Sequence, residues 1–315
     1  MIKFVNAKIN IGLNIVGKRE DGYHLLQTVF YPVGLYVGSP ANPEQFCDIV
    51  ELTSPGELVG NASEVAVHYL PEGLSGCISY YFSGNAVDCP LEKNLLVKGA
   101  ESVLKWAAEK DSSVMEKMHG YQMRLDKHLP DGAGMGGGSA DAVFAMRLLT
   151  DELAKRGLPS PDDDEMRRLA VGLGADCPVF VANRPAYAEG IGERLEIIPE
   201  VLKGKWLVVV KPDLHISTRE AFSGVIPKRP VADLKDLILL PVEEWRDSIH
   251  NDFEDSLFPL YPELARLKRA LYQAGALYAS LTGSGAALYG VFHSRDCAEK
   301  CMLAVDAPYK TLLLL

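Results

Sequence analysis

The sequence predicts an α+β fold in two domains, and three observations support this prediction. The first is length, because 315 residues exceed the size of one typical domain. The second is composition, since 48% hydrophobic and 23% charged residues are enough to bury a globular core. The third is that strand-like and helix-like segments alternate irregularly, without the repeated β-α-β unit of a doubly wound sheet. Gly157 and Pro159 end a predicted helix, so we expect domains at 1–157 and 158–315.

Charge and composition disfavour several classes of protein. The formal net charge of −10 argues against broad binding of nucleic acid or membrane surfaces, which needs concentrated positive charge. The six cysteines form no Cys-x-x-Cys pair, so we expect packing thiols and no zinc site. No apolar run approaches the roughly 20 residues of a membrane span. The N-terminal residues lack the layout of a secretion signal, so we expect a cytoplasmic protein.

Apolar periodicity predicts the elements of the N-terminal half. In chain order these are a strand at 5–11, a turn at 18–22, a strand at 25–33, a helix at 92–110, a strand at 121–125 and a helix at 143–155. Residues 38–88 are rich in Pro, Gly, Ser and Asn, and we expect a β-rich region with many loops there. That region carries no predicted chemistry.

In the C-terminal half, the run Ser160-Pro161-Asp162-Asp163-Asp164-Glu165 has the composition of an acidic metal site. A helix start explains it better, with Ser160 as the N-cap, Pro161 at the first position and carboxylates near the positive helix end. The buried face of that helix is supplied by Met166, Leu169, Ala170 and Leu173. The remaining predicted elements are a strand at 205–211, a helix at 264–271 and a strand, glycine turn and further strand or helix at 277–289.

A glycine-rich loop, Pro130-Asp131-Gly132-Ala133-Gly134-Met135-Gly136-Gly137-Gly138-Ser139, joins a predicted strand to a predicted helix. Glycines let backbone amides approach an anion, and a helix N-terminus adds free N–H groups and a positive dipole end. The loop lacks the Lys-Ser or Lys-Thr of a Walker motif. It contains a Gly-x-Gly-x-x-Gly string, but late in a β-rich region, which argues against a dinucleotide fold. We therefore expect it to bind the phosphates of a nucleotide.

With the following Ala140 and Asp141, this loop resembles the ATP loop of the galactokinase, homoserine kinase, mevalonate kinase and phosphomevalonate kinase (GHMP) superfamily. Within it, the chain is most similar to the 4-diphosphocytidyl-2-C-methyl-D-erythritol kinase family. The further motifs that carry this resemblance lie at 7–10 (Ala-Lys-Ile-Asn), 17–28 (with Asp-Gly-Tyr-His), 174–180 (Gly-Ala-Asp-Cys-Pro-Val-Phe) and 281–285 (Leu-Thr-Gly-Ser-Gly).

The resemblance implies a β-rich N-terminal nucleotide domain, a C-terminal sandwich-like α/β domain and an ATP-dependent kinase that acts on an alcohol. It implies ATP and Mg²⁺ as cofactors and cytidine diphospho-methylerythritol as the small-molecule partner, phosphorylated at its 2-position. A homoserine or phosphomevalonate kinase, a catalytically silent nucleotide-binding relative and, more remotely, a redox enzyme are the alternatives. The Asp-Gly-Tyr-His turn argues against the first, and Lys8 with Asp176 against the second.

The resemblance also implies the catalytic pair. A lone lysine on a strand is usually exposed, and Asp176 before a helix reads locally as a cap or turn residue. By resemblance, Asp176 is instead the catalytic aspartate that orients the acceptor hydroxyl and takes its proton. Lys8 is then the active-site lysine that keeps this carboxylate ionised. Asn10, two residues on, shares a strand face with Lys8 and is a candidate donor to the substrate.

Other roles follow from the resemblance in the same way. ATP binding is implied for Pro130, Asp131, Gly132, Ala133, Gly134, Met135, Gly136, Gly137, Gly138, Ser139, Ala140, Asn94 and Lys127. The hydroxyl of Ser139 is a candidate contact to Mg²⁺, and Asp131 either points away from the phosphates or helps to hold that ion. The loop Gly283, Ser284 and Gly285 is expected to lie beside the glycine loop and support it. Tyr23 and Phe222 would stack on the cytosine, His24 would bond its edge, and Thr218 would lie near the methylerythritol.

Overall fold

The protein is described by a computed structural model that covers residues 1–34, 46–56, 78–85 and 89–315. It has the mixed α and β content expected from the sequence, which confirms the fold class. The chain divides into two compact units that interleave along the sequence. Unit 1 takes Met1–Ala7, Leu35–Asp131 and Gly137–Asn183; unit 2 takes Lys8–Gly34, Gly132–Gly136 and Arg184–Leu315. The expected assignment of ATP binding to 1–157 and of substrate binding to 158–315 stays a prediction.

Unit 1 contains a sheet in which one strand pair is parallel. Its strand order is β1 (Ile2–Val5), β4 (Asp48–Thr53), β6 (Tyr121–Lys127) and β5 (Ile78–Gly84). β5 pairs with β6 in parallel, and the other neighbours are antiparallel. Along β6 buried and half-buried residues alternate, because successive strand side chains point to opposite faces.

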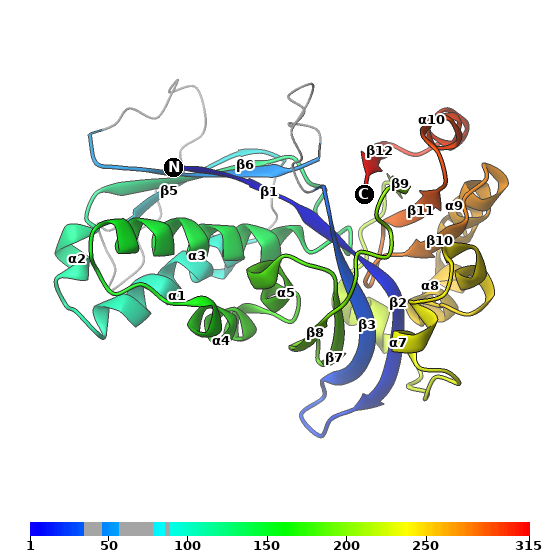
Figure 1. Cartoon of the computed structure of the whole chain (residues 1–315), viewed down its shortest axis with the longest axis horizontal. Coiled ribbons are helices and arrows are strands. Elements are labelled where there is room, and N and C mark those ends of the chain that lie inside the picture. The colour runs from blue at the N-terminus through cyan, green and yellow to red at the C-terminus, as the bar shows by residue number, and fades with distance from the viewer. Residues whose placement is uncertain (35–45, 57–77, 86–88) are drawn as a thin grey trace. The chain divides into compact units, whose positions relative to one another are not determined.

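The helices of unit 1 lie on one side of this sheet. They are η2 (Leu91–Lys93), α1 (Leu95–Ala108), α2 (Val114–Lys117), α3 (Gly137–Lys155), α4 (Asp163–Leu173) and α5 (Cys177–Ala182). Figure 1 shows α1 and α3 side by side along the sheet, and α3 contacts both β1 and β4. Apolar residues at helical spacing, such as Val103 and Ala107 of α1, are fully buried. The helices predicted at 92–110 and 143–155 are therefore confirmed.

Unit 2 contains two sheets. One has the order β2 (Ala7–Lys18), β3 (His24–Val33), β7 (Ala186–Gly190) and β8 (Arg194–Ile197). The other has the order β10 (Tyr278–Leu281), β11 (Leu288–Phe292), β9 (Trp206–Lys211) and β12 (Tyr309–Leu314). The segment at 277–289, whose second part was open between strand and helix, thus continues as the strand β11.

The helices of unit 2 follow β9 and β11 in the sequence. They are α6 (Thr218–Ser223), α7 (Leu234–Leu237), η3 (Val242–Asp247), α8 (Phe253–Leu260), α9 (Pro262–Gln273) and α10 (Arg295–Ala304). α9 contacts β10 and β11, and α10 contacts β9. Leu264, Leu267 and Leu271 of α9 enter a core shared with Val208 and Val210 of β9. Among the described residues, no helix combines the length and apolar character that a bilayer crossing requires.

Two local expectations need correction or restriction. The N-cap of α4 is Asp162 and not Ser160, because the Asp162 carboxylate accepts the Glu165 N–H at 2.8 Å from an extended backbone. The acidic first turn is present as expected. Within 38–88, β4 and β5 supply the expected strand content, and the rest of that expectation falls mainly outside the described residues.

Candidate functional site

Lys8 and Asn10 lie near the start of β2, in unit 2, and are almost fully buried, with exposed fractions of 1% and 2%. Lys8 Nζ donates to Asn10 Oδ1 at 2.6 Å and to the Gly134 carbonyl at 2.9 Å. Asn10 Nδ2 donates to Thr28 Oγ1 at 3.0 Å. Both side chains therefore share a face of β2, as the spacing predicts. A lone lysine on a strand is usually exposed, but Lys8 is buried.

The part of the glycine loop in unit 2 has an alternating backbone. Gly132, Gly134 and Gly136 have φ of +60°, +72° and +70°. Ala133 and Met135 lie between them and are buried. Left-handed glycines that alternate with ordinary residues form the concave arrangement of amides known as an anion nest.

Unit 2 also anchors the carbonyl groups of this segment. The Gly132 carbonyl accepts from Ala286 N (3.1 Å), and the Ala133 carbonyl accepts from Ala287 N (3.3 Å). The Gly134 carbonyl accepts from both Lys8 Nζ (2.9 Å) and Thr282 Oγ1 (3.1 Å). The Met135 carbonyl accepts from Lys8 N (3.0 Å). A trans peptide points its N–H opposite to its C=O. The amides of residues 133–136 therefore point away from these donors, which leaves consecutive N–H groups to face an anion.

The turn at Gly283, Ser284 and Gly285 packs against Gly134. A Cβ atom on Gly134 would stand 2.1 Å from the Thr282 carbonyl, and one on Gly283 would stand 2.8 Å from the Gly134 carbonyl. Side chains at either position would separate the two segments. The turn thus lies beside the glycine loop, and its supporting role in ATP binding stays a prediction.

The ends of the glycine loop belong to unit 1. Asp131 is exposed, and Gly137 is the first residue of α3. Ser139 lies in the first turn of α3 and hydrogen bonds to the Cys177 thiol, whose pKa burial raises to about 12 despite that bond. Ala140 is fully buried. The contact of Ser139 to Mg²⁺ and the role of Asp131 remain predictions.

Asp176, in unit 1, immediately precedes α5. It occupies the N-cap position with φ −85° and ψ −14°, yet its side chain makes no capping hydrogen bond. The interpretation of Asp176 as a helix cap, which its neighbours in the sequence favour, is therefore not supported by its side chain. Lys8 belongs to unit 2 and Asp176 to unit 1, and the meeting of the two stays a prediction.

Lys127 lies in a buried ionic cluster of unit 1 that the sequence did not reveal. Its ammonium contacts the carboxylate of Asp48 and lies 2.7 Å from Asp141 Oδ2. Asp48 Oδ1 also accepts the backbone N–H groups of His128 and Leu129 at 2.6 and 2.7 Å. Lys127 is only 4% exposed, and its Nζ would lie 3.1 Å from a Cβ atom on Gly137, at the start of α3.

The charges in this cluster are unequal, because one ammonium lies between two carboxyl groups. Burial raises the pKa of Asp141 well above its usual value of 3.8, against the opposing effect of Lys127, and Asp48 raises it further. Asp141 Oδ1 is buried without a hydrogen-bond partner. Burial acts to lower the pKa of Lys127, but Asp141 and Asp48 outweigh it and raise that pKa above 10.5. Lys127, with its pKa above 10.5, therefore stays positively charged near neutral pH.

Asn94, the other residue expected on the nucleotide side, is the N-cap of α1. Its Oδ1 accepts the Leu96 N–H at 2.9 Å, and the residue is 7% exposed. This contact accounts for the asparagine at this position as a helix cap. A contact to ATP stays a prediction.

On the expected cytosine side, the structure pairs His24 with Phe222. Their rings stack with centroids 4.7 Å apart and an interplanar angle of 20°, in unit 2. Tyr23 is 61% exposed, and Thr218 is an exposed first residue of α6. Burial, and to a smaller extent the positive charge of Lys18, lower the pKa of His24 below 6.5, so the imidazole is mainly neutral near pH 7.

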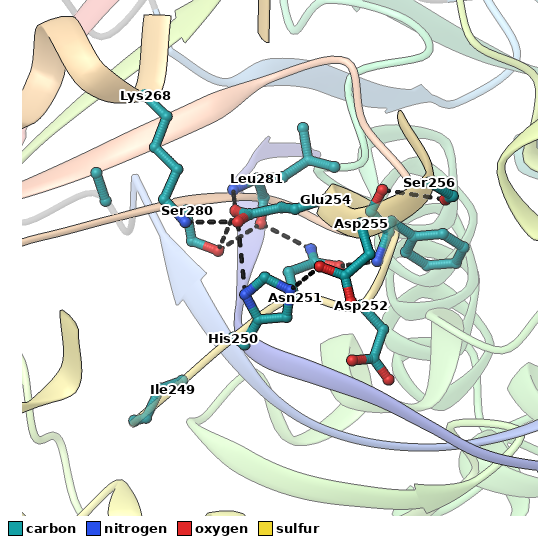
Figure 2. Close-up of polar contacts among 12 residues, drawn as sticks. Ile249, His250, Asn251, Asp252, Glu254, Asp255, Ser256, Lys268, Ser280 and Leu281 are labelled. Carbon is teal, nitrogen blue, oxygen red and sulfur yellow. Dashed lines mark hydrogen bonds and ion pairs between the residues drawn. The ribbon is translucent and has the colours of Figure 1, made fainter. Parts of the chain in front are cut away.

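A group with metal-ligand types lies elsewhere in unit 2. Figure 2 shows His250, Asp252 and Asp255 close together where the chain enters α8, and their candidate ligand atoms lie within 4.8 Å of one another. Lys228 Nζ already lies 3.3 Å from Asp252 and 2.8 Å from Asp255. These carboxylates therefore have a cationic partner, and the cluster is explained without an ion.

Three residues of these sites were missed as candidates by sequence reasoning. Asp141 and Thr282 lie within the quoted motifs, so their position beside the glycines was an available signal. Asp48 lies 79 residues before Lys127 and carries no local signal.

Comparisons with known proteins give a consistent result. A family model described as "GHMP kinases N terminal domain" matches residues 94–184, and one described as "GHMP kinases C terminal" matches 234–311. A Parabacteroides distasonis protein named 4-diphosphocytidyl-2-C-methyl-D-erythritol kinase is 40% identical over 292 residues, covering 93% of this chain and 92% of that one. A Porphyromonas gingivalis protein with the same name is 37% identical over 306 residues and 96% of each chain.

Solved structures are also similar. A crystal structure of 4-(cytidine 5'-diphospho)-2C-methyl-D-erythritol kinase has a TM-score of 0.71 and 26% identity, covering 99% of this chain and 98% of that one. Methanococcus jannaschii mevalonate kinase has a TM-score of 0.64 at 12% identity, over 100% of this chain and 98% of that one, which is a likeness of fold alone.

Proposed function

The chain belongs to the GHMP kinase family of ATP-dependent small-molecule kinases, and we propose that it phosphorylates the 2-hydroxyl of 4-diphosphocytidyl-2-C-methyl-D-erythritol in the non-mevalonate isoprenoid pathway. The support for this acceptor is that relatives with the corresponding name are 37–40% identical over most of the chain. The Asp-Gly-Tyr-His turn at 21–24 agrees with it.

The observation that carries the kinase chemistry is the anchored backbone of Gly132–Met135. Because the carbonyls are held by unit 2, the amides of residues 133–136 are preorganised toward a triphosphate and need little rearrangement on binding. The same loop continues directly into α3, whose first residue is Gly137. In this proposal ATP arrives as its Mg²⁺ complex, so that the metal enters with the substrate.

The catalytic step needs an in-line hydroxyl and a destination for its proton. The acceptor oxygen attacks the γ-phosphorus, the bond to the β-phosphate oxygen breaks, and ADP leaves. Asp176 accepts the hydroxyl proton as the new bond forms. Lys8 supplies a fixed positive charge against the negative charge that develops on the transferring group.

We propose that different residues recognise the cytosine end and the methylerythritol end of the acceptor. Tyr23 and Phe222 offer aromatic faces to the base, and the neutral imidazole of His24 offers a hydrogen bond to its edge. Thr218 is the contact proposed near the methylerythritol. Since both substrates are charged nucleotides, we place the reaction in the cytoplasm.

One substrate screen tests this function. The protein is incubated with Mg-ATP and one acceptor at a time, either the cytidine diphospho-methylerythritol, homoserine or mevalonate. The masses of the products are measured by mass spectrometry. We expect one added phosphoryl group on the first acceptor and none on the other two. Phosphorylation of homoserine or mevalonate instead would contradict the proposed acceptor while leaving the family unchanged.

A further inference from the structure

We propose that Thr282 is a positioning residue of the phosphate-binding loop, and that Asn251 holds the peptide groups around Thr282 in place. Both residues lie in unit 2, as do the glycines on which they act. This inference deepens the proposed function, because it rests on ATP binding at Gly132–Gly136.

The Thr282 hydroxyl connects β2 to the glycine loop. It is fully buried, accepts the Asn10 N–H at 3.1 Å and donates to the Gly134 carbonyl at 3.1 Å. One side-chain group is thus both acceptor and donor between two backbone segments. A methyl group in its place would leave the Asn10 amide without this acceptor.

The carbonyl that Thr282 holds is also the one that Lys8 contacts. Gly134 O accepts from Thr282 Oγ1 and from Lys8 Nζ, so the two donors fix the plane of the peptide between Gly134 and Met135. The Met135 N–H points opposite to that carbonyl. The direction of this amide, and the position of the Lys8 ammonium, therefore depend on the Thr282 hydroxyl.

Asn251 holds the chain on both sides of Thr282. Its Nδ2 donates to the carbonyls of Leu281 and Gly283, at 2.9 and 3.0 Å, and its Oδ1 accepts the Phe253 N–H at 3.0 Å. Figure 2 shows Asn251 directed toward Leu281. Asn251 is fully buried, and because both hydrogens of its Nδ2 and its Oδ1 are engaged, its side-chain amide has one orientation.

The neighbours of Asn251 tie it to β2 as well. Leu13 N donates to His250 O at 2.9 Å, and Asp252 N donates to Leu13 O at 2.8 Å. The segment that carries Asn251 is thus paired with the same strand that carries Lys8. A continuous series of hydrogen bonds therefore runs from Asn251 through the Thr282 turn to Gly134 and Lys8.

Four variants test the proposal. Thr282→Val removes the hydroxyl at nearly constant shape, Thr282→Ala removes it without an added methyl, and Thr282→Ser restores it. Ser280→Ala is the matched control, because Ser280 is a fully buried hydroxyl residue of β10, two residues before Thr282, and it contacts Glu254 and not the glycine loop. For each, calorimetry gives the Kd of Mg-ATP without acceptor, steady-state kinetics give kcat and both KM values, and thermal unfolding gives Tm.

We expect Thr282→Val to raise the Kd of Mg-ATP about tenfold, the factor that corresponds to roughly one net hydrogen bond. kcat should fall as well, and the KM of the acceptor should stay nearly constant. Thr282→Ser should bind ATP as the unchanged chain does, and Ser280→Ala should alter only Tm. If Thr282→Val does not fold, Thr282→Ala is expected to show the same loss of ATP affinity.

Some outcomes would overturn the proposal. Native ATP affinity and kcat in Thr282→Val and Thr282→Ala, with a lower Tm alone, would leave Thr282 a merely structural residue. An equal loss of ATP affinity in Ser280→Ala would assign the effect to the packing of the whole 280–282 segment and not to the Thr282 hydroxyl. If the unchanged chain binds ATP but fails to phosphorylate the cytidine compound, only the proposed acceptor is lost, because the calorimetric comparison does not use it.

Discussion

The ammonium of Lys8 and the carbonyl oxygen of Gly134, 126 residues apart in the sequence, lie 2.9 Å from each other in unit 2. The contact places a buried positive charge directly behind the peptide whose amide is directed at the proposed phosphate site. In the proposed complex, a charge in such a position would act on the triphosphate at low local dielectric, where it has more effect than in water.

Removing this charge should therefore slow phosphoryl transfer. We expect Lys8→Met, which keeps the apolar stem, to lower kcat by about 10²- to 10³-fold, the range for loss of one preorganised electrostatic contact. The measurement is a coupled ADP-release assay. Lys3→Met is the control, since Lys3 lies on β1 as a half-exposed partner of Asp151. A Lys8→Met rate near that of Lys3→Met would remove Lys8 from the mechanism.

Alanine substitutions at Gly134 and Gly157 distinguish the cost of backbone strain from the cost of a steric clash. Gly134 and Gly157 have similar φ of +72° and +68°, but a Cβ atom would meet the Thr282 carbonyl at 2.1 Å in the first and nothing within 4 Å in the second. We expect Gly157→Ala to lower the free energy of unfolding by about 1–2 kcal/mol, the cost of left-handed backbone with a Cβ. Gly134→Ala should lower it further and abolish ATP binding.

Urea unfolding and ATP calorimetry give the two measurements for this pair. Equal destabilisation by the two substitutions, with ATP binding kept in Gly134→Ala, would show that the close approach of Gly134 to Thr282 does not matter for the site.

Sequence reasoning succeeded where the signal was local. The periodicity of 143–155 and the apolar run of 205–211 specify α3 and β9, because each pattern is contained in one element. The helix start at 160–165 was placed too early because Ser160 and Asp162 are both good caps, and only the observed backbone, extended at Asp162, decides between them.

The site was harder to predict because its polar contacts are long-range. The neighbouring residues in the sequence predict an exposed Lys8. Its ammonium is buried because the fold brings Gly134 and Asn10 into contact with it. Asp48 reaches Lys127 only when β4 pairs with β6. Motif resemblance supplied Lys8, but it assigned Lys127 to the nucleotide without its two carboxylate partners.

In the proposed mechanism, Asp176 accepts the proton of the acceptor hydroxyl. We expect Asp176→Ala to lower kcat by about 10²- to 10⁴-fold, the usual contribution of a positioned acid–base group, with the Kd of Mg-ATP unchanged. Single-turnover kinetics and calorimetry measure the two quantities. Asp164→Ala is the control, because Asp164 is a 71% exposed side chain in the first turn of α4. A rate equal to this control would mean that another group takes the proton.

The buried cluster around Lys127 should make stability depend on pH through Asp141. Its pKa is raised in the folded state, so its stabilising contribution is complete below the unfolded value of about 3.9 and is lost as pH rises through the raised pKa. Asp141→Asn cannot lose a proton. We therefore expect the free energy of unfolding of the variant to fall less with rising pH, by up to about 1.4 kcal/mol per pH unit in that window.

Denaturant unfolding of both chains between about pH 4 and pH 8 measures this difference. Asp151→Asn, at a half-exposed carboxylate on α3 that pairs with Lys3, is the control. Parallel curves for the unchanged chain and Asp141→Asn would show that Asp141 does not exchange a proton with folding in this range.

The stack of His24 on Phe222 bears on how the base would bind. Their centroids lie 4.7 Å apart, whereas a base between two rings needs about twice the roughly 3.5 Å contact distance. A cytosine that stacks on this face of Phe222 must therefore displace His24. We expect Phe222→Ala to weaken binding of the cytidine compound by about 1–3 kcal/mol, with ATP binding unchanged. Calorimetry with each ligand measures this, and Phe258→Ala, at a partly buried aromatic of α8, is the control. Because Phe222 also packs edge-on against Phe253 at 4.8 Å, Tm is recorded for both variants. An equal loss of affinity for both ligands would assign the effect to packing and not to the base.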